Sequence, residues 1–483
     1  MPMLLLLSAL AGATSRPAAT LQVAPPSVHA EHARQFGSTG PRAVFASPRL
    51  PALPTPTAGP DLTVYGYLAY WNDDLGTVPW DELTHIAIFN AEVNSDGSLS
   101  YTSRWDQTAD AVAIAQSYGV KVHLCVTNFD STELDLLLNS STARNNLVSQ
   151  LSGWVASTGA DGVNIDFEQM PSSGRTGLVT LTADLEAAVG EVVLATPSVD
   201  WSSAFDYAAL TDHADLFIMG YGYHWSGSSW AGPTDPLYAG SGTIWSGLNS
   251  FSLSWSLDDY LAEGADPDRV ILGLPLYGRA YAAGSSAIPS ASLGDGGAVV
   301  FSEAWAIEAQ QGATYEADSH ALMAYDAGEQ VWFGDAATVA DRIAYARDVA
   351  GVGGVGFWAL NYEGGDTNFW EAVRAETTWS STGTTTPSTL DTAPLDTATT
   401  DTGSGATTPP IDSGTPGSTD PTIDTDEPTT TSPSSSSPDG LTRPEVGGES
   451  PPEPKKGCGC ASAPTSGAWA WLLVALGIVG RRR

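Results

Sequence analysis

Eight short apolar segments, most of them separated by helix-like stretches, constrain the fold of this chain more than any other sequence feature. The strand-like segments are Thr63–Tyr70, His85–Asn90, Lys121–Thr127, Gly162–Glu168, Val192–Pro197, Leu216–Tyr221, Val270–Leu276 and Val355–Leu360. The helix-like stretches are Thr108–Ser117, Ser141–Ser157, Leu178–Val189, Leu257–Glu263 and Ala337–Val349. This alternation predicts an α/β fold, a (β/α)8 TIM barrel over residues 62–376. A small insertion, about Tyr281–Ala327, is expected between the seventh and eighth strands.

The segments on either side of residues 62–376 lack the pattern of a packed domain. Residues 14–61 are rich in Ala and Pro and are interpreted as a linker or a pro-segment. Residues 377–456 consist mainly of Thr, Ser, Pro, Asp and Gly. Such a stretch cannot bury enough apolar surface to offset its ordering entropy, which predicts an extended stalk. We therefore expect one barrel flanked by disordered segments.

Both ends of the chain carry sorting patterns. Residues 1–13 contain an apolar run followed by small residues, which is typical of a signal peptide. Residues 457–483 combine two Cys, an apolar run and closing arginines. That run is shorter than the roughly 20 residues that cross a bilayer comfortably. The tail resembles the sorting tails of myxobacterial surface proteins, and its alternative is a plain membrane anchor. Either interpretation predicts export, with the protein secreted or attached to the cell surface or outer membrane.

Composition narrows the possible partners. The net charge of -36, from 55 acidic and 19 basic residues, argues against nucleic acid, whereas a neutral polysaccharide meets no such repulsion. Three Cys are too few for a disulfide scaffold. Cys125 lies in an apolar run and is expected to pack in the core. Cys458 and Cys460 are too few ligands for a metal site. We predict no cofactor or metal, and a monomer.

The polar residues of Asp161-Gly-Val-Asn-Ile-Asp-Phe-Glu168 point to a site. Alternate residues of a strand share a face, so Asn164, Asp166 and Glu168 point the same way. Buried carboxylates are costly unless they are paired or serve a site. A structural cluster or a calcium loop is the alternative, but the intervening Val, Ile and Phe are typical of a strand. Glu168 closes its strand at the barrel edge where TIM-barrel sites lie, which favours catalysis.

This motif resembles the Asp-Gly-x-Asp-x-Asp-x-Glu signature of family 18 glycoside hydrolases, the chitinase-type barrels. The resemblance extends through most of the predicted barrel, in the segments Tyr65–Trp71, Leu83–Phe89, Met219–His224, Ile271–Arg279 and Gly356–Leu360. Three positions depart from the family pattern. Asn164 and Gly222 stand where the family has Asp, and the third strand ends Thr127-Asn128-Phe129 without the usual Ser-x-Gly-Gly.

The departures shift the expected substrate. Asn-Ile-Asp-Phe-Glu, followed by Met170, Pro171 and Arg175, is similar to the bacterial cell-wall and spore-cortex-lytic branch of the family. The resemblance thus implies a polysaccharide that contains N-acetylglucosamine, with chitin and peptidoglycan both open and endo or exo action undecided. The alternative is a surface lectin on an inactive barrel, which Gly222 keeps open because it removes a polar neighbour.

The resemblance also implies a retaining mechanism in which the substrate's own acetamide replaces a carboxylate nucleophile. Glu168 would be the general acid, with its pKa raised by burial and by the charge of Asp166. Asp166 would orient the acetamide nitrogen and stabilise the oxazolinium-like intermediate. Tyr221 would donate to the acetamide oxygen, a core Tyr being the alternative. Asn164 cannot take up charge, so an active enzyme with a shifted pH profile is expected.

Aromatic residues are the expected sugar contacts, because a flat ring offers a large contact area to a pyranose face. By resemblance, Trp358 would form the floor beneath the sugar at the cleavage point. The other substrate-binding candidates are Asn164, Tyr67, Trp71 and Trp225, and Trp201 and Trp332 are platforms or core residues. Asp161 is out of phase with the other acidic residues and is expected to brace the strand.

Overall fold

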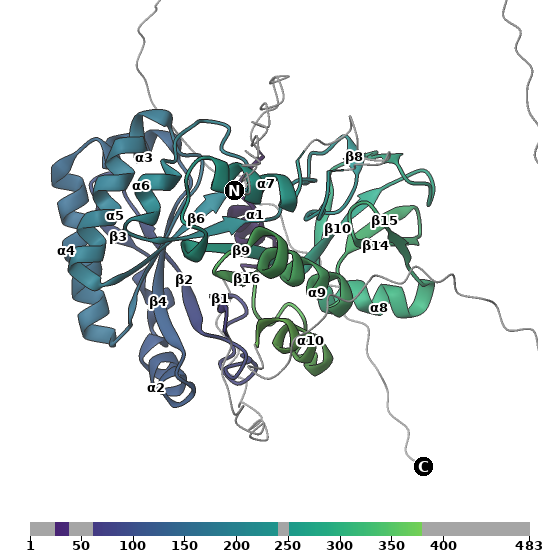
Figure 1. Ribbon diagram of the computed structural model, residues 1–483, viewed down its shortest axis with the longest axis horizontal. Coiled ribbons are helices and arrows are strands. Elements are labelled where there is room, and N and C mark those ends of the chain that lie inside the picture. Colours follow the sequence, from purple (N-terminus) through teal and green to yellow (C-terminus); the bar gives the residue numbers. More distant parts are fainter. Residues whose placement is uncertain (1–24, 38–60, 240–250, 379–483) are drawn as a thin grey trace, which may run out of the picture. The chain divides into compact units, whose positions relative to one another are not determined.

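The computed structural model describes residues 25–37, 61–239 and 251–378, and its main feature is a closed barrel of parallel strands (Figure 1). The barrel strands are β1 (Thr63–Ala69), β2 (His85–Val93), β4 (Lys121–Asn128), β5 (Gly162–Phe167), β6 (Glu191–Pro197), β7 (Asp215–Met219), β9 (Val270–Pro275) and β16 (Gly354–Trp358). Each pairs in parallel with its neighbours, and β1 pairs with both β2 and β16, which closes the sheet. The predicted (β/α)8 barrel is confirmed.

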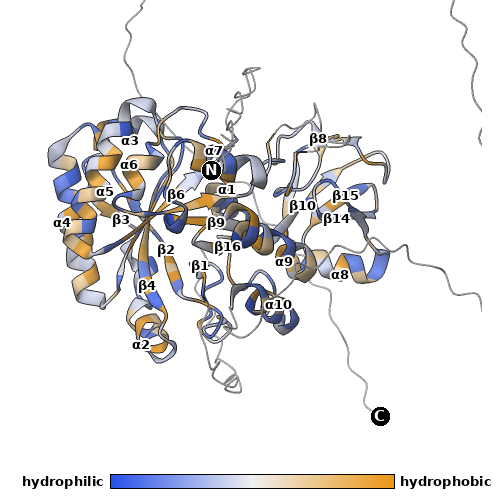
Figure 2. Ribbon diagram, in the orientation of Figure 1, coloured by the Kyte–Doolittle hydropathy of each residue, from blue (hydrophilic) through white to orange (hydrophobic). Residues whose placement is uncertain are grey.

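Helices surround the barrel on its outer side. They are α2 (Thr108–Tyr118), α3 (Ser131–Leu138), α4 (Ser141–Thr158), α5 (Arg175–Val189), α6 (Tyr207–Thr211), α7 (Leu253–Ala262), α9 (Ala336–Ala344) and α10 (Thr367–Thr377). Short elements complete this part: β3 (Leu99–Ser100), η1 (Thr102–Trp105), η2 (Ser172–Gly174), η3 (Pro267–Arg269) and η4 (Tyr345–Ala350). Apolar residues run along the central strands, and the helices carry both polar and apolar residues (Figure 2). This arrangement buries the core between sheet and helices.

Capping residues define the ends of α3 and α4, the two helices between β4 and β5. Asp130 caps α3, with its side chain accepting from the N–H groups of Thr132 and Glu133. Ser140 caps α4 in the same way, through the N–H of Ala143, and Gly159 ends it with φ at 75°. That left-handed conformation favours glycine. The chain therefore returns to β5 in a defined register.

The predicted insertion between β9 and β16 is present, and it forms a small antiparallel domain that begins at Tyr277 and reaches Phe333. Its elements are β10 (Tyr277–Ala282), β12 (Gly297–Val300), α8 (Phe301–Gln311), β13 (Thr314–Glu316), β14 (Ala321–Asp326) and β15 (Glu329–Phe333). The strands β8 (Trp230–Ala231) and β11 (Ser290–Ala291) form a separate pair. Trp332 is fully buried in the insertion core, so it is a packing residue.

Among the described residues, one helix precedes the barrel. Helix α1 (Val28–Phe36) lies within the segment that composition marked as a linker or pro-segment. The predicted signal peptide, stalk and C-terminal tail lie outside the described residues. Across residues 25–37, 61–239 and 251–378, no helix is both long enough and apolar enough to cross a membrane.

Candidate active site

Strand β5 carries the central polar residues to the C-terminal end of the barrel. Asn164 and Asp166 are fully buried, and Glu168 follows the last residue of the strand. The N–H of Glu168 donates to the carbonyl of Asn128 at 3.1 Å, which extends the pairing with β4 by one residue. Gln169 then takes a left-handed conformation, with φ at 58°, and turns the chain away. Glu168 is thereby fixed at the rim.

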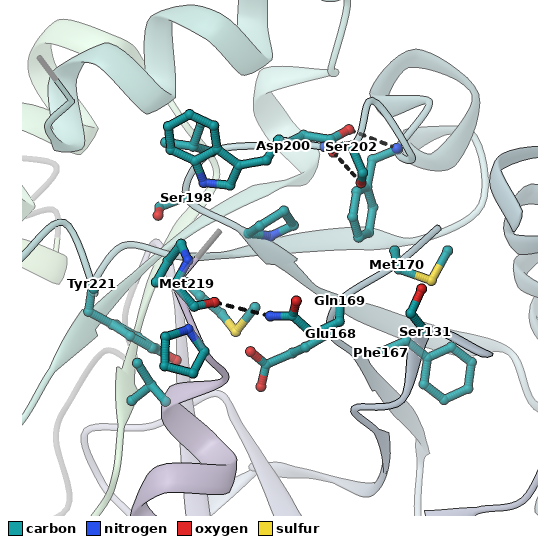
Figure 3. Close-up of a pocket in the computed structure, with 18 residues that line it drawn as sticks. Ser131, Phe167, Glu168, Gln169, Met170, Ser198, Asp200, Ser202, Met219 and Tyr221 are labelled. Atoms are coloured by element: carbon teal, nitrogen blue, oxygen red, sulfur yellow. Dashed lines mark hydrogen bonds between the residues drawn. The ribbon is translucent and has the colours of Figure 1, made fainter. Parts of the chain in front are cut away.

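Glu168 has the environment that a general acid needs. Its side chain is 10% exposed and lines a cavity of about 200 Å³ (Figure 3). Burial, and then the charge of Asp166, raise the pKa of Glu168 to about 7, although His29 and a hydrogen bond from Ser27 oppose the rise. A carboxyl group with such a pKa keeps its proton near neutral pH and can donate it.

Asp166 and Tyr221 face each other across one planar ring. His29 places Nδ1 at 2.6 Å from Asp166 Oδ2 and Nε2 at 2.8 Å from the Tyr221 hydroxyl. The second oxygen of Asp166, Oδ1, is buried and has no hydrogen-bond partner among the described residues. Burial raises the pKa of Tyr221 well above its ordinary value, so the phenol keeps its proton. The pair thus offers a hydrogen-bond acceptor opposite a donor.

The environment of His29 fixes where its proton lies. Burial lowers its pKa, but the charge of Asp166 and the hydrogen bond to it outweigh burial, so the pKa of His29 is raised overall. The Asp166 carboxylate can only accept, which places a proton on Nδ1. Above that raised pKa the ring is neutral with its proton on Nδ1, and Nε2 accepts from the hydroxyl of Tyr221. Below it the ring is an imidazolium, and Nε2 donates to the same hydroxyl.

The side chain of Asn164 makes its hydrogen bonds to residues of two other barrel strands. Its amide nitrogen donates to the Tyr67 hydroxyl at 2.8 Å, and its amide oxygen accepts from the Cys125 thiol at 3.2 Å. Both groups of the amide are therefore used below the site. Cys125 is buried, as predicted, and it also orients Asn164, which the sequence did not indicate.

Trp358 lies at the centre of an aromatic cluster at the end of β16. Its indole stacks on the His29 ring with centroids 3.7 Å apart and an interplanar angle of 28°. Tyr67 and Trp71 lie edge-on to it, at 5.6 Å and 6.1 Å. Trp71 also donates through Nε1 to the Tyr362 hydroxyl at 3.0 Å. These three predicted substrate-binding aromatic residues therefore lie together.

Two other predicted tryptophans lie in a separate part of the cleft. Trp225 and Trp201 line a second cavity of about 580 Å³, and Trp201 also borders the cavity beside Glu168. The two cavities are neighbours, because they share the lining residues Pro25, Ser198, Val199, Trp201 and Gly222. Asp161 lies apart from the site, because its carboxylate accepts from the N–H of Val122 at 2.8 Å, as bracing requires.

The backbone conformation at Gly222 explains why glycine stands at this position. Gly222 has φ at 87°, which L side chains rarely adopt, and its N–H donates to Thr234 Oγ1 at 2.9 Å. A Cβ would meet only a methyl of Val28, at 3.7 Å. The position is therefore restricted by backbone conformation and not by space. The backbone N–H of Gly222 supplies a polar contact of its own here.

Sequence reasoning missed Ser27 and His29. Ser27 Oγ donates to Glu168 Oε1 at 2.5 Å, and His29 contacts both Asp166 and Tyr221. The available signal was weak: a Ser at a helix start, followed by His29 and His32 one turn apart, in a chain with only seven His.

Within the part of the chain that the structure describes, two groups of side chains have the spacing of a metal site. The first is His29, Asp166 and Glu168. Both ring nitrogens of His29 already have hydrogen-bond partners, and Glu168 accepts from Ser27. Because the ring nitrogens of His29 and one oxygen of Glu168 are engaged in this way, this group fits a hydrogen-bonded cluster better than a metal centre.

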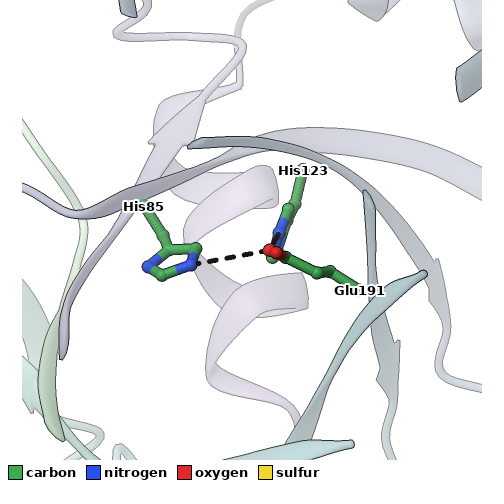
Figure 4. A group of neighbouring side chains, drawn as sticks. All are labelled: His85, His123 and Glu191. Atoms are coloured by element: carbon green, nitrogen blue, oxygen red, sulfur yellow. Dashed lines mark hydrogen bonds and ion pairs between the residues drawn. The ribbon is translucent and has the colours of Figure 1, made fainter. Parts of the chain in front are cut away.

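The second group lies at the opposite end of the barrel strands, where His85, His123 and Glu191 meet (Figure 4). Glu191 Oε2 lies 3.3 Å from His123 Nε2 and 3.7 Å from His85 Nε2, and the Lys121 ammonium contacts the same carboxylate. Hydrogen bonds from His123, His85 and Lys121 hold the pKa of Glu191 well below its ordinary value. The Lys121 ammonium already neutralises the Glu191 carboxylate, so we interpret the cluster as an ion-pair network.

Comparison with known proteins identifies the family of the barrel. Residues 63–363 match the family described as "Glycosyl hydrolases family 18". The chain is 28% identical over 210 residues to a putative sporulation-specific glycosylase, YdhD, of Bacillus subtilis, covering 40% of this chain and 45% of that protein. It is 28% identical over 176 residues to probable chitinase 2 of Drosophila melanogaster, covering 34% and 35%. The matches thus span less than half the length of these two relatives.

Solved structures share the fold. The second catalytic domain of the Group II chitinase of Ostrinia furnacalis superimposes with a TM-score of 0.60 at 19% identity, covering 66% of this chain and 96% of that one. A chitinase from Cycas revoluta, solved in complex with (GlcNAc)3, gives 0.59 at 18% identity, covering 65% and 99%. Since the family match covers the whole barrel, this chain belongs to family 18 of the glycosyl hydrolases.

Proposed function

We propose that this protein is a retaining glycosidase that cleaves β-1,4 bonds next to N-acetylglucosamine, with Glu168 as general acid. The observation that carries the proposal is that Glu168 lines a cavity and has a raised pKa, so that its carboxyl group keeps a proton to donate. Donating that proton to the glycosidic oxygen lets the leaving sugar depart. The remaining charge at the anomeric carbon must then be stabilised from the other side.

Asp166 and Tyr221 suit that second task. They hold a planar ring between an acceptor and a donor, at 2.6 Å and 2.8 Å. An acetamide group presents the same pattern, because its N–H donates and its carbonyl oxygen accepts. Held in this way, the carbonyl oxygen is directed at the anomeric carbon and acts as the nucleophile. Asp166 then stabilises the positive charge of the cyclic intermediate.

Trp358 would support the sugar at the cleavage point. Its ring already stacks on a flat group that lies between Asp166 and Tyr221. A pyranose ring in that position would gain the same apolar contact. Tyr67 and Trp71 would complete the wall, and Trp201 and Trp225 would contact the glycan further along the cleft.

The substrate class follows from what chitin and peptidoglycan share, which is the 2-acetamido sugar. The names of the relatives include both chitinases and a sporulation-specific glycosylase. Asn164 and Gly222 favour the cell-wall branch, as the sequence similarity implied. We therefore propose a peptidoglycan-type glycan as the preferred substrate and chitin oligomers as a usable one.

The proposal predicts that the first product carries the β configuration at its new reducing end. The test uses the full chain with Ser27→Ala and His29→Ala, so that neither side chain competes for the site. This variant is incubated with N-acetylglucosamine oligomers and with purified peptidoglycan, and products are followed by NMR and mass spectrometry. An α-anomer as first product contradicts the acetamide route. Binding without any new reducing ends would instead indicate a lectin.

We further propose that the enzyme works outside the cytoplasm, attached through residues 457–483. The support is the sequence pattern of this tail, with its Cys pair, short apolar run and terminal arginines. Deleting residues 457–483 should move the protein from the cell-surface fraction to the medium, as followed by immunoblot. A matched control deletes an equal length of the stalk, within 377–456, and should leave the protein attached. Retention of the tail-deleted chain at the surface would contradict the proposal.

A further inference from the structure

We propose that residues 25–37 are an intramolecular inhibitor that occupies the catalytic cleft as a pseudosubstrate, an inference that rests on the proposed glycosidase function. This segment contains α1, which lies over the open end of the barrel near β9 and β16 (Figure 1). Its side chains contact the general acid, the acetamide-binding pair and the aromatic floor. No glycan can occupy the cleavage point until the segment leaves.

His29 copies the recognition pattern of the substrate. Its protonated Nδ1 faces Asp166 and its Nε2 faces Tyr221, so the neutral ring supplies the donor and the acceptor of an acetamide. The ring also stacks on Trp358 and is fully buried. A ring that was merely packed in a core would not need all three partners. The match in both polarity and contact surface points to mimicry.

Ser27 blocks the proton donor. Its hydroxyl lies 2.5 Å from Glu168 Oε1, at the position from which a glycosidic oxygen would receive the proton. The same oxygen of Ser27 accepts from the N–H of Ala30, which caps α1. The hydroxyl of Ser27 therefore both caps α1 and covers Glu168. Gln169 adds a contact, because its side-chain amide donates to the carbonyl of Pro25 at 3.0 Å.

Charge and polar contacts anchor the rest of the segment to the insertion. Glu31 binds the fully buried guanidinium of Arg279 through two hydrogen bonds of 2.8 Å and 3.0 Å. Gln35 donates to the carbonyl of Ala298 at 2.9 Å. His32 Nδ1 accepts from the indole N–H of Trp358 at 3.0 Å. The segment thus bridges the barrel and the insertion across the cleft.

Covalent attachment makes this inhibition effective without high affinity. Residues 25–37 belong to the same chain as β1, so the segment competes with substrate at an effective concentration of the order of millimolar. The anchoring contacts are hydrogen bonds and one ion pair, which can separate. The intact chain is therefore expected to turn over slowly, and loss of the segment to release its activity.

The test compares full-length variants. His29→Ala should raise kcat/KM on (GlcNAc)4 by about 10-fold or more, because it removes a hydrogen bond to a charged group. Ser27→Ala, His29→Ala and Glu31→Ala together should raise kcat/KM by at least about 10²-fold. Arg34→Ala is the matched control, since Arg34 is exposed on the same helix and its loss should leave kcat/KM unchanged. Equal kcat/KM in the wild-type chain and the triple variant would overturn the proposal.

A peptide of residues 25–37 adds a test in trans. At millimolar concentration it should inhibit the triple variant competitively with (GlcNAc)4, and the same peptide with His29→Ala should not. Failure of the wild-type peptide to inhibit, at concentrations above the expected effective concentration, counts against mimicry.

Hydrogen exchange separates this proposal from the proposed function. Backbone amides of residues 28–36 should be protected in the wild-type chain and should exchange faster in the triple variant. If no variant cleaves any glycan but this pattern holds, the glycosidase proposal fails while the segment is still shown to occupy the cleft. If the amides of residues 28–36 exchange equally fast in both chains, the inhibitor proposal fails whatever the activity.

Discussion

Replacing Glu168 with Gln is expected to lower kcat on N-acetylglucosamine oligomers by about 10² to 10⁴, the range for loss of a general acid. Gln keeps the size and hydrogen-bonding shape of the side chain but has no acidic proton. The measurement is made in the full chain with Ser27→Ala and His29→Ala, so that the cleft is open before the acid is removed. KM should change little, because the carboxyl group acts on the bond that breaks.

The ion-pair network provides the matched control. Glu191→Gln makes the same chemical change at the opposite end of the barrel strands and should leave kcat unchanged. The pH profile adds a second criterion. Burial raises the pKa of Glu168 to about 7 in the native chain, and removing His29 and Ser27, which both lower it, should raise it further. The acid therefore keeps its proton at neutral pH in this variant, and kcat/KM should fall only as pH rises above about 7. A Glu168→Gln variant with unaltered turnover would remove Glu168 from the mechanism.

Glycans without the 2-acetamido group should be cleaved at least about 10³-fold more slowly than N-acetylglucosamine oligomers. The proposed nucleophile is part of the substrate, and an oriented intramolecular group contributes effective molarities of about 10⁵ M or more. Among the described residues, the carboxylate at the reaction centre besides Glu168 is Asp166, which lies buried and holds an imidazole ring. The comparison uses β-1,4 oligomers of glucose and of N-acetylglucosamine with equal length, assayed for new reducing ends.

Binding must be measured beside turnover in that comparison. Titration monitored by tryptophan fluorescence reports whether glucose oligomers still enter the cleft. Glucose oligomers that bind and are not cleaved support an acetamide nucleophile. Equal cleavage of both series would show that the protein itself supplies the nucleophile, and the substrate-assisted mechanism would then be wrong.

The barrel was predictable because its signals are local. Apolar runs such as Val270–Leu276 predict strands without reference to distant residues. Because helices separate these strands, few chain topologies are possible. The motif predicted Glu168 as the last residue of its strand, and the structure places it one residue beyond β5. Trp358 was predicted from the same kind of segment similarity. The insertion was harder, because short antiparallel strands such as Thr314–Glu316 are too brief to show periodicity.

The occupant of the cleft could not be predicted from sequence. Ser27 and Glu168 are 141 positions apart, and His29 and Tyr221 are 192 apart, so nothing local connects them. The surrounding Ala and Pro content indicated a linker. The direction of the Asn164 amide was equally hidden, because it depends on Tyr67 and Cys125 on other strands. Contacts of this kind are set by tertiary packing.

The fit of one imidazole between Asp166 and Tyr221 has a consequence for ligand design. A small azole with one N–H and one ring lone pair satisfies the acceptor, the donor and the indole face at once. Such a scaffold needs no carbohydrate, and a hydroxyl-bearing arm directed at Glu168 would extend it. The chain's own histidine thereby supplies the template for non-sugar inhibitors of this barrel.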